Sequence, residues 1–184
     1  MTHDWQILFD EMHPNFFARE YIRAIPKENT YSEMALSLPA FSELELSIPV
    51  PPGTRFGLWK GDLDTLREYV AQVDPGWVKL YDGQQRVLCG FAGDELASFC
   101  MLEDFGEHGD MRIAGPGCVG TLPAFRRKGI GLRMIQLATR MLRDEGYDLS
   151  WIHYTGVAPW YARLGYKTVL IWGAEGVRSV AEPW

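Results

Sequence analysis

The stretch "VGTLPAFRRKGIGLRMI" (residues 119–135) places three consecutive cations and two glycines at the start of an apolar segment with helical spacing. A helix start exposes backbone N–H groups without partners and about half a positive charge. Glycine costs about 1 kcal/mol inside a helix, so Gly129 and Gly131 need a reason. Without a Cβ, the main chain is open to a bulky anion, and Arg126, Arg127 and Lys128 add positive charge. The stretch predicts a site for a pyrophosphate; the alternative is a basic loop with packing glycines.

Two familiar nucleotide motifs do not fit this stretch. A P-loop requires GxxxxGK followed by Ser or Thr, which the sequence does not contain. A dinucleotide fingerprint requires GxGxxG, and Met134 occupies the third glycine position. The remaining pattern is R-x-x-G-x-G between a strand and a helix.

Composition restricts the partners of the chain. Its 184 residues are 47% apolar and carry a formal net charge of −6, so we expect no nucleic-acid partner and no anionic-membrane surface. No apolar run approaches the ~20 residues of a membrane helix, and the first residues do not resemble a secretory signal. We therefore expect a cytoplasmic protein. Cys89, Cys100 and Cys118 lack metal-ligand spacing, and no metal site is expected. We expect buried free thiols; a disulfide or a catalytic thiol is the alternative.

Regular organisation is predicted from residue 54 onward. Periodicity predicts a strand at 54–59, a helix within 61–74, a hairpin over 86–106 and a strand at 111–122. Gly115, Pro116 and Gly117 predict a bulge or a local parting within that last strand. A helix from residue 130, a strand at 148–154, a short helix at 158–165 and a strand at 166–172 follow.

The first 53 residues have a different character. The segment "NFFAREYIRAI" (15–25) predicts a short amphipathic helix ended by Pro26. The segment at 36–53 contains four prolines and predicts an extended chain laid over a surface. We therefore predict an N-terminal extension, residues 1–53, packed on or near a domain spanning 54–184.

From residue 54 to 172 the chain resembles the GNAT superfamily of acyl-CoA-dependent N-acetyltransferases. The stretch quoted above is similar to the cofactor motif of that family. The segment "WYARLGYKTV" (160–169) is similar to its second motif, with Tyr161 four residues before Gly165. The resemblance implies an α+β fold in which a mixed, mostly antiparallel central sheet, splayed between its fourth and fifth strands, is flanked by helices.

The resemblance also implies acetyl-CoA as co-substrate. Backbone groups of Val119 and Thr121 would pair with the pantetheine arm. The pyrophosphate would be cradled by N–H groups of the turn, assisted by the cations at its start; these residues are Arg126, Arg127, Lys128, Gly129, Ile130, Gly131 and Leu132. Many family members carry an Asn near "HYTGVAP" (153–159), and here Thr155 or Tyr154 would replace its hydrogen bond to the cofactor.

Three residues are catalytic candidates. By the resemblance, Tyr161 would stand near the thioester sulfur, and its phenol would act as general acid; the alternative is an aromatic ring that only packs the short helix. Glu103 is a candidate general base that could also simply face water. His153 has a suitable chemistry, although a lone His on an apolar strand is commonly a packed core residue. The alternative to both candidate bases is a chain of water molecules.

The leading hypothesis is an enzyme that moves an acetyl group from acetyl-CoA to a primary amine by direct attack, without a covalent enzyme intermediate. The acceptor is a small amine or a peptide. The acids Glu103, Asp104, Glu107 and Asp110 favour a cationic acceptor, and the alternative is that they belong to a solvated loop. One alternative is a non-catalytic acyl-CoA-binding regulatory module. Another is a protein acetyltransferase that docks its partner through residues 1–53. The chain is expected to be a monomer or a homodimer.

Overall fold

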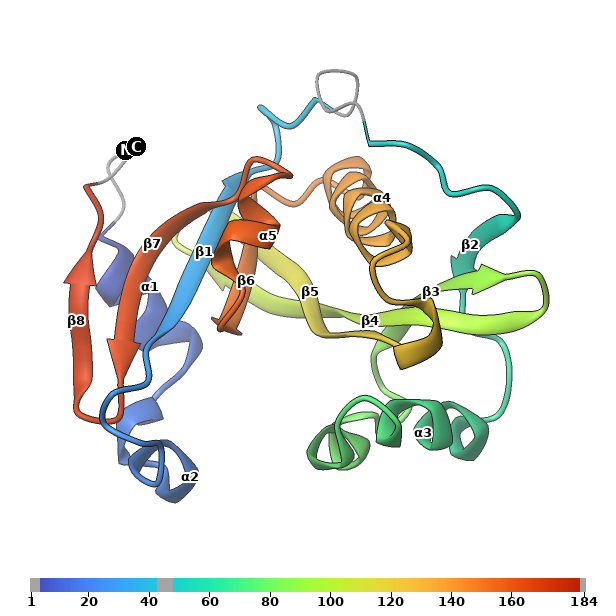
Figure 1. Ribbon diagram of the computed structural model, residues 1–184. Helices are drawn as coiled ribbons and strands as arrows, with labels where there is room; N and C mark the ends of the chain where they lie inside the picture. Colours follow the sequence, from blue (N-terminus) through green and yellow to red (C-terminus); the bar gives the residue numbers. More distant parts are fainter. Residues whose placement is uncertain (1–3, 43–47, 183–184) are drawn as a thin grey trace.

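The computed structural model describes residues 4–42 and 48–182. Figure 1 shows the arrangement of its elements, which are α1 (Trp5–Met12), η1 (Phe16–Ala18), α2 (Glu20–Arg23), β1 (Tyr31–Ser37), β2 (Thr54–Leu58), α3 (Leu63–Ala71), η3 (Pro75–Leu80), β3 (Arg86–Ala92), β4 (Glu95–His108), β5 (Met111–Thr121), η4 (Pro123–Phe125), α4 (Ile130–Asp144), β6 (Leu149–Thr155), α5 (Ala158–Ala162), β7 (Lys167–Gly173) and β8 (Gly176–Val180).

The strands form one eight-stranded sheet in the order β2-β3-β4-β5-β6-β1-β7-β8. Every neighbouring pair is antiparallel except β5 and β6, which are parallel. The predicted α+β fold is confirmed. The predicted sequence of elements from residue 54 onward is confirmed as well, and β8 is added after it.

The sheet opens between β5 and β6, which are the fourth and fifth strands counted from residue 54. The two strands pair only at Ile113 with Leu149 and at Ala114 with Ser150. At the next residue, Gly115, a Cβ would run into the backbone carbonyl of Trp151. A glycine is therefore needed where the two strands begin to diverge, and the predicted splay is confirmed.

The N-terminal segment contributes a strand to the middle of the sheet. β1 lies between β6 and β7 and pairs antiparallel with both. The prediction that regular organisation begins at residue 54 was therefore wrong, and the boundary proposed at residue 53 falls in the connection between two strands of one sheet. The segment was missed because its partners come more than a hundred residues later, and local pattern cannot reveal such a pairing.

The single helix predicted over 15–25 was also wrong. The chain forms the short η1 and α2 instead, separated at Arg19. The last turn of α2 ends three residues before Pro26. Of the extended segment predicted over 36–53, residues 36 and 37 belong to β1, residues 48–52 have an irregular backbone, and residues 43–47 lie outside the described part.

Helices cover both faces of the sheet. α4 packs on one face and α3 on the other (Figure 1). Alternation along the strands assigns further side chains to these faces. Ile113 and Trp151 pack with α1, whereas Leu102 and Ile152 pack with α4. The face with α1 and α3 is called the α3 face below, and the opposite one the α4 face.

Candidate functional site

The turn before α4 has the backbone that the two glycines suggested. Gly129 is the N-cap residue of α4 with φ 82°, a conformation that side chains rarely adopt, and Arg127 also has a positive φ of 62°. No side chain in the described part of the chain caps the N–H groups of this helix. Arg126 donates through Nε to the carbonyl oxygen of Thr121 at 3.0 Å, which ties the turn to the end of β5. The N–H groups of the first turn are thus left for another acceptor.

Gly131 has a further role that the sequence did not reveal. A Cβ at this position would lie 2.7 Å from Oγ1 of Thr121 and 3.6 Å from the Trp160 ring. The first contact is too short for a real side chain. Gly131 therefore lets α4 approach β5 closely, so packing contributes to the choice of glycine at this position.

A cleft of about 920 Å³ runs from this turn to Tyr161. It is lined by the end of β5, the start of α4, α5 and its flanks, and the segment before β2; the lining residues that carry the argument are Val119, Thr121, the run 126–132, Trp160, Tyr161 and the run 48–52. All but one of the cofactor-binding residues expected from the sequence line this cleft. The sequence did not predict that the proline-rich segment at 48–52 forms one of its walls.

Thr155 is the expected cofactor residue that does not line the cleft. Its side chain is buried, and Oγ1 accepts the N–H of Val157 at 3.1 Å. It therefore stabilises the turn into α5. Tyr154, the alternative, has a positive φ of 55°, and burial raises its pKa to about 12.

Tyr161 lines the cleft. It is 6% exposed and packs edge-to-face on Trp160 at 4.8 Å between ring centroids. Burial raises the pKa of its phenol far above the ordinary value near 10, with smaller contributions from the neighbouring Cys100 and Tyr166. Tyr161 therefore carries its proton at neutral pH.

A bulge interrupts β5 beside the opening of the sheet. Met101 pairs with Gly117 and Phe99 with Gly120, so Cys118 and Val119 oppose a single residue of β4. The bulge thus follows the Gly-Pro-Gly segment at which the sequence predicted it. Cys118 has a positive φ of 44°, and its carbonyl oxygen accepts the hydroxyl of Tyr81 at 2.8 Å.

The three cysteines are free thiols. Burial raises the pKa of Cys89 and of Cys118 to about 12 and raises that of Cys100 further. Thiols with such pKa values are poor nucleophiles at neutral pH. A covalent role for Cys118 has no support, although it lies next to Val119.

Glu103 and His153 lie on the face of the sheet opposite to α4. Glu103 alternates with Leu102, which packs with α4, and its carboxylate occupies the space above Gly117, where a Cβ would collide with it. Burial raises the pKa of Glu103, and the charge of nearby His153 partly opposes this effect. The two candidate bases therefore lie on the same face of the sheet and interact electrostatically.

The acids predicted to attract a cationic acceptor do not form one cluster. Glu103 faces the α3 side, whereas Asp104 accepts the hydroxyl of Tyr147 at 2.9 Å on the α4 face. Glu107 and Asp110 are exposed near the connection between β4 and β5. Only Glu103 lies in a position that combines burial with proximity to the opening.

His153 contacts a buried carboxylate from β1. Its Nδ1 lies 3.0 Å from the nearer oxygen of Glu33, whose side chain is fully buried. The ring of His153 is stacked on that of His13, with centroids 3.9 Å apart and planes at 20°. Neither partner is predictable from local pattern, because His13 and Glu33 lie more than a hundred residues before His153 in the sequence.

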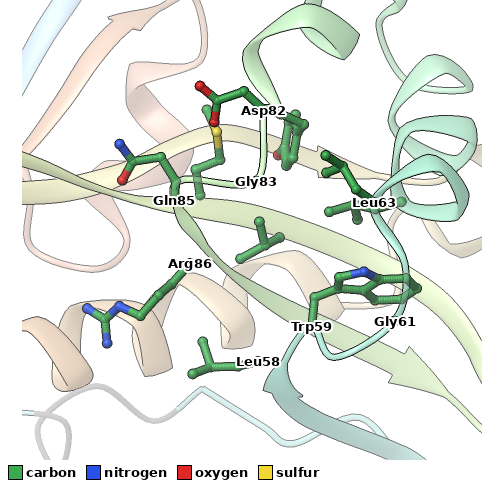
Figure 2. Close-up of a pocket in the computed structure, with 12 residues that line it drawn as sticks. Leu58, Trp59, Gly61, Leu63, Asp82, Gly83, Gln85 and Arg86 are labelled. Carbon is green, nitrogen blue, oxygen red and sulfur yellow. The ribbon is translucent and has the colours of Figure 1, made fainter.

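A smaller hollow of about 330 Å³ lies where β2 and β3 meet the start of α3. Figure 2 shows Trp59 and Leu63 on one side of it and Asp82 and Gln85 on the other. Arg86, also in its lining, is bound at 2.7 Å to Glu145 and does not act as a free cation. The hollow is separate from the cleft at α4.

Comparison with known proteins agrees with this geometry. Residues 80–168 match the family model described as "Acetyltransferase (GNAT) domain". Comparison with curated proteins gave no match. No helix in the described residues is both long and apolar enough to cross a membrane.

Solved structures with the same fold include several described as GCN5-related acetyltransferases. A glucosamine N-acetyltransferase region of a fungal multi-domain β-N-acetylglucosaminidase has a TM-score of 0.66 at 20% identity, over 90% of this chain and 22% of that one. A protein from Sphaerobacter thermophilus has a TM-score of 0.58 at 16% identity, over 89% of this chain and 52% of that one. A protein from Kribbella flavida has a TM-score of 0.56 at 16% identity, over 84% of this chain and 60% of that one. The match thus spans less than two thirds of each of these chains.

Proposed function

Because the chain carries a GNAT acetyltransferase domain, we propose that it transfers an acetyl group from acetyl-CoA to a primary amine. The observation that carries the proposal is the cleft of about 920 Å³ that joins the uncapped start of α4 to the phenol of Tyr161. Its volume lies within the ~300–1,000 Å³ of small-molecule sites. The donor set fits an elongated ligand with a doubly phosphorylated end and an apolar arm.

Different residues of the cleft bind different parts of acetyl-CoA. Backbone N–H groups from Arg127 to Leu132 receive the pyrophosphate, and Arg126 and Lys128 supply positive charge beside it. The backbone of Val119 and Thr121 pairs with the pantetheine arm along the diverging strand. The wall at 48–52, with exposed Val50, adds apolar contact.

The chemistry requires a proton acceptor and a proton donor on opposite sides of the thioester. As the amine nitrogen forms its bond to the acetyl carbon, it gives a proton to a base on the α3 face, for which Glu103 and His153 are the candidates. The backbone N–H of Val119 stabilises the negative charge on the carbonyl oxygen. Tyr161 then donates its proton to the thiolate as the carbon–sulfur bond breaks. No residue needs to become acylated.

The two faces of the sheet suggest how donor and acceptor meet. Tyr161 packs with the α4 cluster, whereas Glu103 lies on the α3 face. We propose that acetyl-CoA enters from the α4 face and the amine from the α3 face, and that they meet where β5 and β6 diverge. Glu103 is partly buried on this face, and its ionised carboxylate would favour a cationic amine, either a small molecule or a peptide.

A thiol-release assay with acetyl-CoA tests the activity across polyamines, amino acids, peptides and amino sugars. Glucosamine belongs in this panel because the fungal region with the same fold is described as a glucosamine N-acetyltransferase. We expect turnover with at least one amine. If CoA binds but no amine or peptide is acetylated, the non-catalytic acyl-CoA-binding module replaces the enzyme.

Calorimetry tests the cofactor assignment independently of the acceptor. Lys128→Glu is expected to weaken CoA binding at least about tenfold, equivalent to about 1.4 kcal/mol. Lys79→Glu makes the same charge change at an exposed position outside the cleft and is expected to leave affinity unchanged. Equal affinity in both variants would contradict the placement of the pyrophosphate at this turn.

A further inference from the structure

Glu33 is a buried carboxylate saturated by N–H donors. It accepts the indole N–H of Trp151 at 2.7 Å and that of Trp172 at 2.8 Å. It also accepts the backbone N–H of Tyr154 at 3.0 Å and lies 3.0 Å from Nδ1 of His153. A buried carboxylate is unfavourable unless hydrogen bonds compensate for the lost hydration. The N–H donors of β6 and β7 therefore have to be in place for Glu33 of β1 to be buried.

An ionised carboxylate has only acceptor atoms. A ring nitrogen in contact with it must therefore carry the proton, which makes Nδ1 of His153 the donor. In the neutral imidazole the lone pair then resides on Nε2, the nitrogen directed away from Glu33. His153 is 22% exposed, whereas Glu33 is fully buried, so this ring connects the buried carboxylate with a more accessible region.

The plane of the His153 ring is fixed as well. His13 stacks on it at 3.9 Å, and Phe16 meets it edge-on at 5.1 Å. Burial, followed by the charges of His153 and Arg19, lowers the pKa of His13 to about 3. The His13 ring is therefore uncharged at physiological pH, and it does not compete with His153 for the Glu33 carboxylate.

These three side chains meet the spacing of a metal site, but their geometry does not. His13, Glu33 and His153 offer ligand atoms within 4.8 Å of one another. The oxygens of Glu33 are already used by N–H donors, and the lone pairs of two stacked rings lie in nearly parallel planes that do not converge on one ion. A positioned imidazole fits this geometry better than a metal ligand set.

We propose that Glu33 is a positioning residue that holds His153 in the Nδ1–H tautomer, so that Nε2 takes the proton of the attacking amine. The role of Nε2 in proton transfer rests on the proposed acetyl transfer. The tautomer of His153, in contrast, is a property of the folded protein alone. Glu103 lies on the same face as His153 and attracts the ammonium form of the acceptor. The ammonium nitrogen loses one proton before it attacks and a second once the carbon–nitrogen bond has formed. Nε2 takes these protons in turn and passes them to solvent, and one proton returns from solvent to Tyr161 to replace the one given to the thiolate.

The charged and titratable groups that surround His153 come from several elements. Glu33 faces it from β1, His13 from the end of α1, and Glu103 interacts with it from β4. Tyr154 precedes the end of the same strand, with ring centroids 6.0 Å apart. Any pH dependence of the acetyl-transfer rate therefore reflects all of these side chains together.

Nitrogen-15 NMR of the histidine rings tests the tautomer in the wild-type protein. We expect the proton of neutral His153 on Nδ1. A proton on Nε2 overturns the proposal without any variant, so the test survives even if a substitution prevents folding. It also requires no acetyl transfer and is thus separate from the proposed function.

Glu33→Gln tests the link to catalysis. The amide has one oxygen and one NH₂ group, so it no longer forces the proton onto Nδ1. We expect a population of the Nε2–H tautomer and a fall of kcat/KM of at least about tenfold, with an unchanged KM for acetyl-CoA. In His153→Gln, kcat/KM is expected to fall about 100-fold, within the range for a general base. The double variant Glu33→Gln, His153→Gln is expected to lose no more than His153→Gln alone, because the two residues act through one proton transfer.

Ser150→Ala is the matched control. Ser150 is also buried in β6 and loses a hydrogen bond of 2.7 Å to Tyr166 on the α4 face. In Ser150→Ala, the tautomer of His153 and the shape of the pH–rate profile are expected to match those of the wild type. Both His153→Gln and Glu33→Gln are expected to change that profile. A changed tautomer in Glu33→Gln with wild-type rates overturns the catalytic role of the pair. If the wild type acetylates no amine, the proposed function and this role both fall, and the NMR result alone decides the pairing.

Discussion

The substitution Gly131→Ala separates packing from anion binding at the start of α4. Its Cβ would lie 2.7 Å from Oγ1 of Thr121, while the next contact, to Trp160 at 3.6 Å, is ordinary. Overpacking of this kind costs about 1–3 kcal/mol, and replacing glycine in a helix returns up to about 1 kcal/mol. We expect a net loss of about 1–2 kcal/mol in the free energy of unfolding. This corresponds to a fall in Tm of about 2–8 °C for a domain of this size.

Removing the obstructing atom should reverse that loss. In the double variant Thr121→Ala, Gly131→Ala, we expect stability within about 0.5 kcal/mol of Thr121→Ala alone, because Oγ1 no longer meets the new Cβ. The backbone carbonyl of residue 121 still accepts Arg126. Since the Cβ would point at β5 and Trp160, we expect CoA affinity in the double variant within about threefold of that of Thr121→Ala.

Chemical denaturation and calorimetry on the four proteins give the answer. If stability recovers while affinity stays low, the bare main chain at residue 131 is itself required by the ligand, as the sequence first suggested. If stability does not recover, the crowding arises elsewhere and the packing argument fails.

Three further predictions follow from the fold and the site. Tyr161→Phe should lower kcat about 100-fold with unchanged CoA affinity, measured by steady-state kinetics and calorimetry; equal kcat would remove its role as general acid. Glu145→Gln should cost about 0.5–1 kcal/mol near neutral pH, because Arg86 holds the pKa of Glu145 below its ordinary value. Stability from a lowered carboxyl pKa is present above the unfolded pKa and lost as pH falls, so denaturation of the variant and wild type should converge in acid. Deletion of residues 1–53 should abolish cooperative unfolding, because β1 pairs on both edges; a folded truncated protein would contradict this.

The elements that the sequence predicted correctly are those with local signals. The hairpin of β3 and β4 has its turn at Gly93 and Asp94, and α4 has a clear apolar stripe and a glycine N-cap. The cleft residues from 126 to 132 could be predicted for the same reason, because one turn and one helix start position them. These features depend on neighbours in the sequence.

The parts that escaped prediction depend on distant partners. Glu33 looks like a solvent-facing acid within a short segment, and its burial depends on N–H groups from β6 and β7, including the indoles of Trp151 and Trp172. Glu103 and Asp104 are adjacent in sequence, but strand alternation directs them to opposite faces. The position of Thr155 before the second motif predicts a contact with the cofactor, whereas its hydroxyl oxygen accepts the N–H of Val157.

The position of β1 has a consequence for biosynthesis. Glu33 and Trp151 are 118 residues apart in the sequence, so during translation β1 leaves the ribosome long before either strand that will flank it. Until β6 and β7 have emerged, the apolar faces of β1 and a carboxylate destined for the interior remain exposed to solvent. The nascent chain therefore completes this half of its sheet only after β7 has emerged, and until then the exposed strand is a binding site for chaperones.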